Sequence, residues 1–169
     1  MPKIKDRPEY RSKAPVMCFP PDTPVHVAVS AMSAKNYGAA VVVDTDQKPV
    51  GIVTERDFMR RLLDKNLDPQ TTKLSDIMTR DVKVAAPDDE IVDWMQRMSK
   101  DRFRHVPVVD ADGRLINMMS LVDFVSYTWP ALLGQVRDRA ISTIFSKYQI
   151  VTAIAVVALY TIIMVKVIK

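Results

Sequence analysis

The pattern of apolar and polar positions in the first part of the chain recurs later in the chain at one constant offset. This repeat offset relates Pro21-Asp22 to Pro87-Asp88, Met32-Ser33 to Met98-Ser99, Val42-Val43-Asp44 to Val108-Val109-Asp110, and Asp57-Phe58 to Asp123-Phe124. The two copies align without a gap from Val16 and Val82 to Phe58 and Phe124. The pattern therefore predicts two copies of one supersecondary unit, and we expect each copy to need the other to bury its core.

Both copies predict the same order of elements. A short apolar strand at 16–19 or 82–85 precedes a helix-start signal, Asp22-Thr23-Pro24 in the first copy and Asp88-Asp89-Glu90 in the second. The following helix has apolar residues at helical spacing. Apolar strands are expected at 39–43 and 106–109, and third strands at 50–53 and 115–119. A final helix begins near Thr54 or Ser120 in each copy.

The pattern changes after the second copy. Residues 129–147 have apolar positions near helical spacing with charges between them, which indicates an amphipathic connector helix. Residues 150–165 carry no charge, so a polar face is missing there. With flanking residues, 148–169 is predicted to be a single transmembrane anchor, because terminal lysines can reach the interface. The alternative is a helix buried in a protein complex.

Charge and composition narrow the function. The chain has 169 residues, 48% of them hydrophobic, and a net charge of +4. This modest excess does not by itself indicate nucleic-acid binding. The basic arm at 1–13 has no apolar core and is interpreted as a solvated or partner-draped tail rather than a secretory signal. Basic residues before the anchor predict that the folded part faces the cytosol or the mitochondrial matrix.

Candidate chemistry lies where the third strand of each copy meets its final helix. Thr54 and Asp57, like Ser120 and Asp123, have the spacing of a helix capping box, which is a structural role. The same turn offers backbone N–H groups that suit phosphate, and a nearby carboxylate could accept the hydroxyls of a ribose. No enzyme motif and no metal-ligand motif is recognised, and the single cysteine, Cys18, cannot form an intrachain disulfide.

These segments resemble cystathionine-β-synthase-type (CBS) domains. The resemblance rests on Gly-Ile-Val-Thr-Glu-Arg-Asp at 51–57, Arg-His-Val-Pro-Val-Val-Asp at 104–110 and Ile-Met-Thr at 77–79. It implies an α/β (α+β) fold in which two β-α-β-β-α repeats, 14–66 and 67–128, form a Bateman module with clefts between them. Such clefts often bind AMP, ADP, ATP or S-adenosylmethionine.

The resemblance also assigns expected roles by position. Asp57 and Asp123 would hold ribose hydroxyls, Thr54 and Ser120 would contact phosphate or ribose, Arg104 and His105 would lie near phosphate, and Val16 and Val82 would flank the adenine. The second copy has Asn117 in place of Gly51, and the first has Gly38-Ala39 in place of Arg104-His105. One competent cleft, the one containing Asp57, is therefore expected more than two.

The sequence thus leaves two functions open. One is a membrane-anchored regulatory module, not an enzyme, that binds an adenosine-containing ligand and modulates a membrane partner. The other is a structural subunit of a membrane complex without ligand sensing. In either case we expect a homodimer or a complex with a host subunit, no required cofactor, no metal and no nucleic acid.

Overall fold

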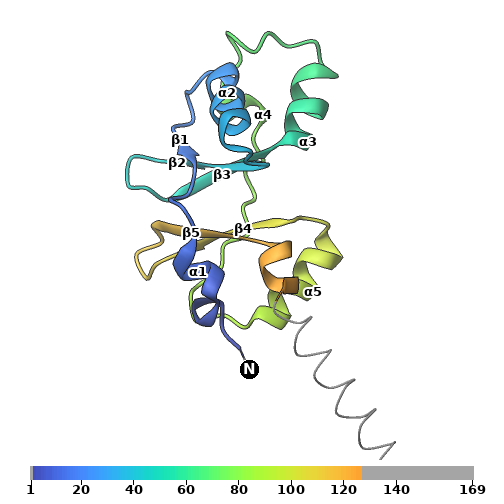
Figure 1. Cartoon of the computed structure of the whole chain (residues 1–169). Coiled ribbons are helices and arrows are strands. Elements are labelled where there is room, and N and C mark those ends of the chain that lie inside the picture. The colour runs from blue at the N-terminus through green and yellow to red at the C-terminus, as the bar shows by residue number, and fades with distance from the viewer. Residues whose placement is uncertain (1, 127–169) are drawn as a thin grey trace, which may run out of the picture. The chain divides into compact units, whose positions relative to one another are not determined.

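The computed structural model describes residues 2–126, of which 2–124 belong to one compact unit (Figure 1). The expected connector at 129–147 and the expected anchor at 148–169 lie outside the described residues. No helix within the described residues is long and apolar enough to cross a membrane.

The first repeat is a three-stranded sheet with helices on one side. Its strands are β1 (Cys18–Phe19), β2 (Ala39–Val43) and β3 (Pro49–Thr54), in the order β1-β2-β3. Strand β1 runs parallel to β2, and β3 runs antiparallel to it. Helix α2 (Val25–Lys35) joins β1 to β2, whereas α3 (Glu55–Asp57) and the π-helical turn η2 (Phe58–Leu63) follow β3. The residues of β2 are all buried, as their continuous apolar run predicts.

The second repeat reproduces this arrangement at the repeat offset found in the sequence. Helix α5 (Ile91–Asp101) precedes the antiparallel strands β4 (His105–Val109) and β5 (Leu115–Ser120), and residues 121–126 are helical. His105 pairs with Ser120 as Ala39 pairs with Thr54. The predicted strand at 82–85 is reduced to a bridge between Ala85 and Val108, in the register that Phe19 and Val42 have in the first repeat. The repeat inferred from the sequence is therefore confirmed.

Each repeat has its own apolar core beneath its sheet. The first includes Val25, Val42, Val53 and Leu62, and the second includes Ile91, Val106, Met119 and Phe124. The helices that cover the two cores end in the same way. Asn36 and Arg102, both C-caps, adopt left-handed conformations with φ of 58° and 56°. Asparagine adopts this conformation readily, whereas an arginine there stores local strain.

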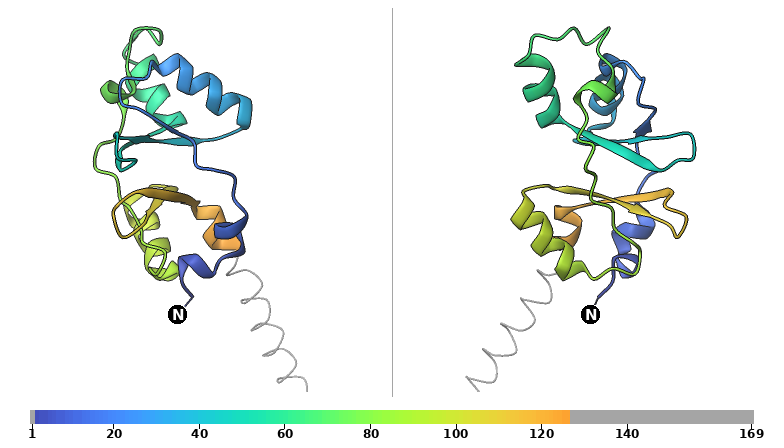
Figure 2. Two further views of the ribbon diagram at one scale, coloured as in Figure 1. Left: turned by 90° about the vertical axis from the view of Figure 1, so that its left-hand side faces the viewer. Right: turned by 180° about the vertical axis from the view of Figure 1, so that it is seen from behind.

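The N-terminal arm is folded, which corrects the expectation of a solvated tail. It contains the 3-10 turn η1 (Ile4–Asp6) and the short helix α1 (Pro8–Ser12), and Figures 1 and 2 show both beside the second repeat. Ile4 is fully buried in the core of that repeat, and Arg7 is only 2% exposed. The tail interpretation was wrong because one isoleucine among charged residues gives no periodic signal, yet its burial is enough to fix the segment.

The arm mirrors the segment that precedes the second repeat. Helix α4 (Leu74–Ile77) lies on the first repeat and contributes Leu74 and Ile77 to its core. Lys3-Ile4-Lys5-Asp6 therefore corresponds to Lys73-Leu74-Ser75-Asp76, in which the aspartate accepts a hydrogen bond from the lysine N–H at 3.1 Å and 3.0 Å respectively. The shared pattern of a lysine, an aliphatic residue and an aspartate was the sequence signal for a folded arm.

Candidate functional site

The largest concentration of arginine side chains in the described residues lines a cleft between β3, α3 and the start of β4. This Asp57 cleft has a volume of about 300 Å³. Its lining comes from both repeats and consists of Gly38, Ile52, Thr54, Glu55, Arg56, Asp57, Arg60, Arg61, Thr79, Arg102, Phe103, Arg104 and His105. A second cavity of about 470 Å³ shares Ile52, Thr79, Phe103 and His105 with it and adds Val82. The two cavities therefore adjoin through these four shared residues.

The two carboxylate oxygens of Asp57 have different hydrogen-bond partners. Its Oδ2 accepts hydrogen bonds from the Thr54 N–H at 2.9 Å and from the Thr54 hydroxyl at 2.7 Å, which is the predicted helix cap. Among the described residues, its Oδ1 has only distant polar neighbours, the Thr79 hydroxyl at 3.5 Å and Arg61 Nε at 3.6 Å. Because these contacts are long, Oδ1 retains capacity to accept a hydrogen bond from a ligand.

The charge of the Asp57 cleft is strongly positive. Five arginines line it, against the two carboxylates of Glu55 and Asp57. Arg61 is held in place by a 2.8 Å hydrogen bond from its Nη1 to the Ile77 carbonyl. Guanidinium groups bind phosphate oxygens through paired hydrogen bonds, so this lining suits a phosphorylated ligand. The strained backbone of Arg102 places a cation here where the first repeat has Asn36.

His105 lies at the junction of the clefts. It lines the Asp57 cleft, the cavity that continues it, and the cleft on the other side of β4. Burial lowers the pKa of His105 below its ordinary value of 6.5, and the charges of Arg104 and Lys13 lower it further. Glu55 and Asp123 act in the opposite direction without reversing the shift. The imidazole is therefore neutral at pH 7, and an added phosphate would favour its protonation.

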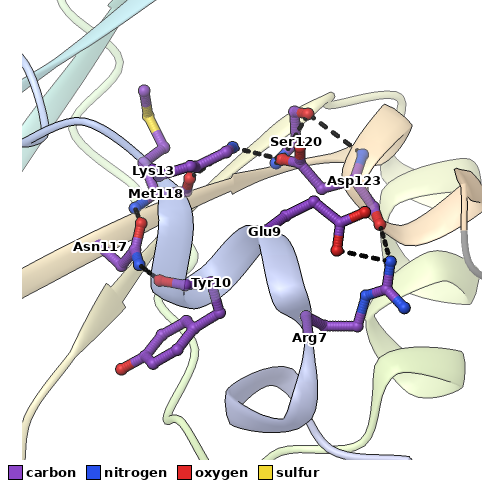
Figure 3. A network of polar contacts seen from close by, with 8 residues as sticks. All are labelled: Arg7, Glu9, Tyr10, Lys13, Asn117, Met118, Ser120 and Asp123. Carbon is purple, nitrogen blue, oxygen red and sulfur yellow. Dashed lines mark hydrogen bonds and ion pairs between the residues drawn. The ribbon is translucent and has the colours of Figure 1, made fainter.

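A second cleft, the Asp123 cleft, lies at the equivalent place in the other repeat and also has a volume of about 300 Å³. Its lining is Lys13, Ala14, Pro15, Val16, Met17, Asn36, Tyr37, Gly38, Ala39, His105, Asn117, Met118 and Ser120. The Asp123 Oδ2 accepts hydrogen bonds from the Ser120 N–H and hydroxyl, both at 2.6 Å. Lys13 Nζ forms an ion pair with the same oxygen, as Figure 3 shows.

The sequence-predicted residues are thus divided between the two clefts. Thr54, Asp57, Arg104, His105 and Val82 border the Asp57 site, although Thr54 and Arg104 come from different repeats. Ser120 and Val16 line the other cleft. Asp123 is not part of its lining, but Lys13, which does line the cleft, pairs with the Asp123 carboxylate. Sequence reasoning missed the other cations and a hydroxyl, namely Lys13, Arg56, Arg60, Arg61, Arg102 and Thr79. The i,i+4 spacing of Arg56 and Arg60 on one helical turn was an available signal.

Gly51 has a structural role that its sequence context did not reveal. A Cβ atom at Gly51 would lie 2.2 Å from Met78 Sδ and 2.8 Å from Met78 Cγ. The glycine therefore makes room for a core methionine that follows α4. At the equivalent position, Asn117 donates a 2.6 Å hydrogen bond from Nδ2 to the Tyr10 carbonyl and so holds the arm. Within residues 2–126, no cluster of three or more His, Cys, Asp or Glu side chains could hold a metal ion.

The model of the CBS domain family matches residues 9–64 and 74–129. A mitochondrial CBS domain-containing protein of Arabidopsis thaliana is 38% identical over 112 residues, which are 64% of this chain and 53% of that protein. The chain therefore spans about half the length of this curated relative.

Two solved structures with the same fold match this chain over nearly their whole length. A CBS-domain-containing protein from Agrobacterium tumefaciens is 31% identical with a TM-score of 0.67, covering 75% of this chain and 99% of that one. A CBS domain pair solved in complex with 5-methylthioadenosine and S-adenosyl-L-methionine is 27% identical with a TM-score of 0.65, covering 78% of this chain and 98% of that one.

Proposed function

Because this chain belongs to the CBS-domain family, we propose that it is a regulatory module whose Asp57 cleft binds an adenine nucleotide. The single observation that carries the proposal is the pairing of a weakly engaged carboxylate oxygen, Asp57 Oδ1, with a cluster of arginines in one cavity. A carboxylate can accept both hydroxyls of a ribose, while guanidinium groups bind phosphate. A nucleotide presents ribose hydroxyls and phosphate at a fixed separation.

The lining suggests how the nucleotide would lie. The ribose would approach Asp57 where the two cavities meet, beside Thr79. The phosphates would extend toward Arg56, Arg60, Arg102 and Arg104. The base would enter the continuing cavity, in which Ile52, Val82 and Phe103 offer apolar and aromatic contact.

Charge favours one class among the candidate ligands. The excess of arginines attracts a ligand in proportion to its negative charge, so we expect ATP and ADP to bind more tightly than AMP. The sulfonium of S-adenosylmethionine is a cation and would be disfavoured by the same surface. A related CBS pair binds S-adenosyl-L-methionine, so this ranking is a property proposed for this chain alone.

The regulatory step would act through the two repeats. The cleft takes Asp57 from the first repeat and Arg104 from the second, so a bound nucleotide would contact both. A ligand shifts an equilibrium only when it binds one arrangement better than another. We propose that nucleotide binding favours one packing of the repeats and so changes how the module holds a membrane partner.

Titration calorimetry of the full-length chain tests the proposal. AMP, ADP, ATP and S-adenosylmethionine are titrated into the wild-type chain and into Asp57→Asn, because asparagine can still cap the helix. Losing a charge-assisted hydrogen bond of roughly 1.5–3 kcal/mol weakens binding by about ten- to a hundredfold. Asp93→Asn, an exposed carboxylate on α5, is the matched control and should bind as the wild type does.

A second function remains in competition because Thr54 and Asp57 already serve as a helix cap. In a structural subunit of a membrane complex, the capping role would be their whole role. If none of the four compounds gives heat or a thermal shift with the folded wild-type chain, the structural subunit replaces the sensor.

Membrane attachment is a separate part of the proposal. The uncharged run at 150–165 supports a single-pass anchor, with the CBS pair on the cytosolic or matrix side. We expect the full chain to fractionate with membranes and to resist alkaline extraction, whereas a chain ending at residue 146 should be released. A full chain that stays in the supernatant without detergent or partner would contradict the anchor.

A further inference from the structure

The Asp123 cleft contains a cation supplied by the chain itself. Lys13 Nζ forms an ion pair with Asp123 Oδ2 and donates a 2.9 Å hydrogen bond to the Met118 carbonyl (Figure 3). We propose that Lys13 determines which cleft binds a nucleotide. Its ammonium group occupies the position that a ribose would take in the Asp123 cleft, so the two repeats together bind one nucleotide, in the Asp57 cleft. The expectation of one bound nucleotide rests on the proposed function, whereas the closing of the Asp123 cleft rests on the contacts of Lys13.

The internal repeat identifies what Lys13 replaces. At the repeat offset, Lys13 corresponds to Thr79, just as Asp123 corresponds to Asp57. Thr79 presents a hydroxyl 3.5 Å from Asp57 Oδ1 and leaves that oxygen weakly engaged. Lys13 presents an ammonium in direct contact with the Asp123 carboxylate. One repeat position thus faces the ribose-binding carboxylate in both clefts, and the residue there differs in charge and reach.

The position of Lys13 is fixed by the arm that carries it. Ile4 is buried in the core of the second repeat, and Arg7 Nη2 donates a 2.9 Å hydrogen bond to the Asp123 carbonyl. Farther along, the Tyr10 carbonyl accepts the hydrogen bond from Asn117. Figure 3 shows the contacts of Arg7, Tyr10 and Lys13 with the second repeat. Since the arm is attached before Lys13 is reached, the ion pair costs little additional ordering of the backbone.

A nucleoside would have to break this ion pair to reach Asp123. The side chains are only 30% exposed for Lys13 and 14% for Asp123, so water screens the attraction poorly. Burial alone would raise the pKa of Asp123, but hydrogen bonds from Lys13 and Ser120 outweigh it and lower the pKa. Lys13 is also the only lysine or arginine in the described lining of this cleft, which contrasts with five arginines in the other. A nucleotide would therefore gain little phosphate binding in exchange.

Exchanging the two repeat positions tests the inference. AMP is titrated into the full-length wild-type chain, Lys13→Thr and Thr79→Lys, and the number of sites is measured by calorimetry. We expect one site in the wild type and none in Thr79→Lys. In Lys13→Thr we expect a second site that binds AMP more weakly than the first, because the described lining of the Asp123 cleft then keeps no lysine or arginine for the phosphate. Lys13→Gln, which keeps most of the length of the side chain without its charge, should also open the second site. Lys5→Thr is the control, because Lys5 pairs with Asp88 outside both clefts, and it should retain one site.

The variants also separate this inference from the proposed function. Binding at the single wild-type site should weaken by about ten- to a hundredfold in Asp57→Asn and should stay unchanged in Asp123→Asn. Two sites in the wild-type chain, or no site gained when Lys13 is replaced in a chain that unfolds at the wild-type temperature, would overturn the inference. A wild-type chain that binds none of AMP, ADP and ATP would refute the proposed function, whereas one site gained in Lys13→Thr would still support the role of Lys13.

Discussion

Ile4 occupies in the second repeat the place that Leu74 occupies in the first. The Ile4 N–H donates to the Asp89 carbonyl at 3.0 Å, and the Leu74 N–H donates to the Thr23 carbonyl at 2.9 Å. Both side chains are fully buried, in separate cores. Each repeat is therefore completed by the segment that precedes the other repeat in the chain. This exchange makes the pair one folding unit rather than two independent domains.

The exchange predicts that the arm is essential for stability. Ile4→Ala should reduce the free energy of unfolding by about 2–5 kcal/mol, as large-to-small changes in cores do, and Leu74→Ala should cost a similar amount. Chemical denaturation monitored by circular dichroism measures both. Ile116→Ala is the matched control, since Ile116 is 43% exposed and should cost much less stability. An Ile4→Ala chain as stable as the control would show that the arm does not complete the core.

Gly51 should resist substitution because of Met78. Gly51→Ala forces the methionine out of its place under the strand and should cost about 1–3 kcal/mol, the usual range for overpacking. The thermal unfolding temperature reports the loss. When Gly51→Ala is combined with Met78→Ala, the total cost should be smaller than the sum of the two single costs, because the clash is gone. Strict additivity would mean that the two residues do not conflict.

The arginines should discriminate nucleotides by phosphate number. Arg104→Gln and Arg102→Gln should weaken ATP binding by about tenfold or more each, the loss of one charge-assisted hydrogen bond, and should weaken AMP binding less. Calorimetry at two salt concentrations checks this, because the attraction should fade as salt rises. Arg114→Gln, a change in the exposed turn before β5, is the control. Equal losses for AMP and ATP would argue against contacts between these arginines and the β- and γ-phosphates.

His105 should make both stability and binding depend on pH. Its pKa is lowered in the folded chain, so between pH 7.5 and 5.5 the unfolded chain binds a proton more readily and stability should fall as the pH falls. A bound phosphate favours the imidazolium, so the bound state should take up a proton and ATP binding should tighten over the same interval. His105→Gln should reduce both slopes. Calorimetry in buffers of different ionisation enthalpy would detect the proton, and its absence would exclude His105 from the phosphate site.

Self-association is expected through the helices that end each repeat. Met59 and Leu63 are 58% and 64% exposed on η2, and Val122 is 75% exposed at the equivalent end of the second repeat. Met59 and Leu63 are four residues apart on η2, and exposed apolar side chains that adjoin in this way can mark an interface. We expect a chain ending at residue 146 to sediment as a dimer, and Met59→Glu with Leu63→Glu to shift it to a monomer. A monomer at all concentrations would leave these residues to a host subunit.

The sequence by itself determined the duplicated unit and the order of its elements. At the repeat offset, Thr54 corresponds to Ser120 and Asp57 corresponds to Asp123. The strand registers repeat at that offset because apolar alternation specifies which face is buried. The helix caps at the same positions followed from local spacing alone. These features depend on contacts between near neighbours in the chain or on periodicity, both of which are legible in one dimension.

Only the tertiary structure decided which side chains from distant parts of the chain meet at each cleft. Lys13 and Asp123 lie near opposite ends of the described chain, and Arg102 reaches the cleft of Asp57 from the other repeat. No periodicity links such pairs, because their proximity follows from how the repeats exchange their preceding segments. The arm was misread for the same reason: the burial of Ile4 depends on a core built by residues 85–124, and a single apolar side chain gains its stabilising role only when that core is present to surround it.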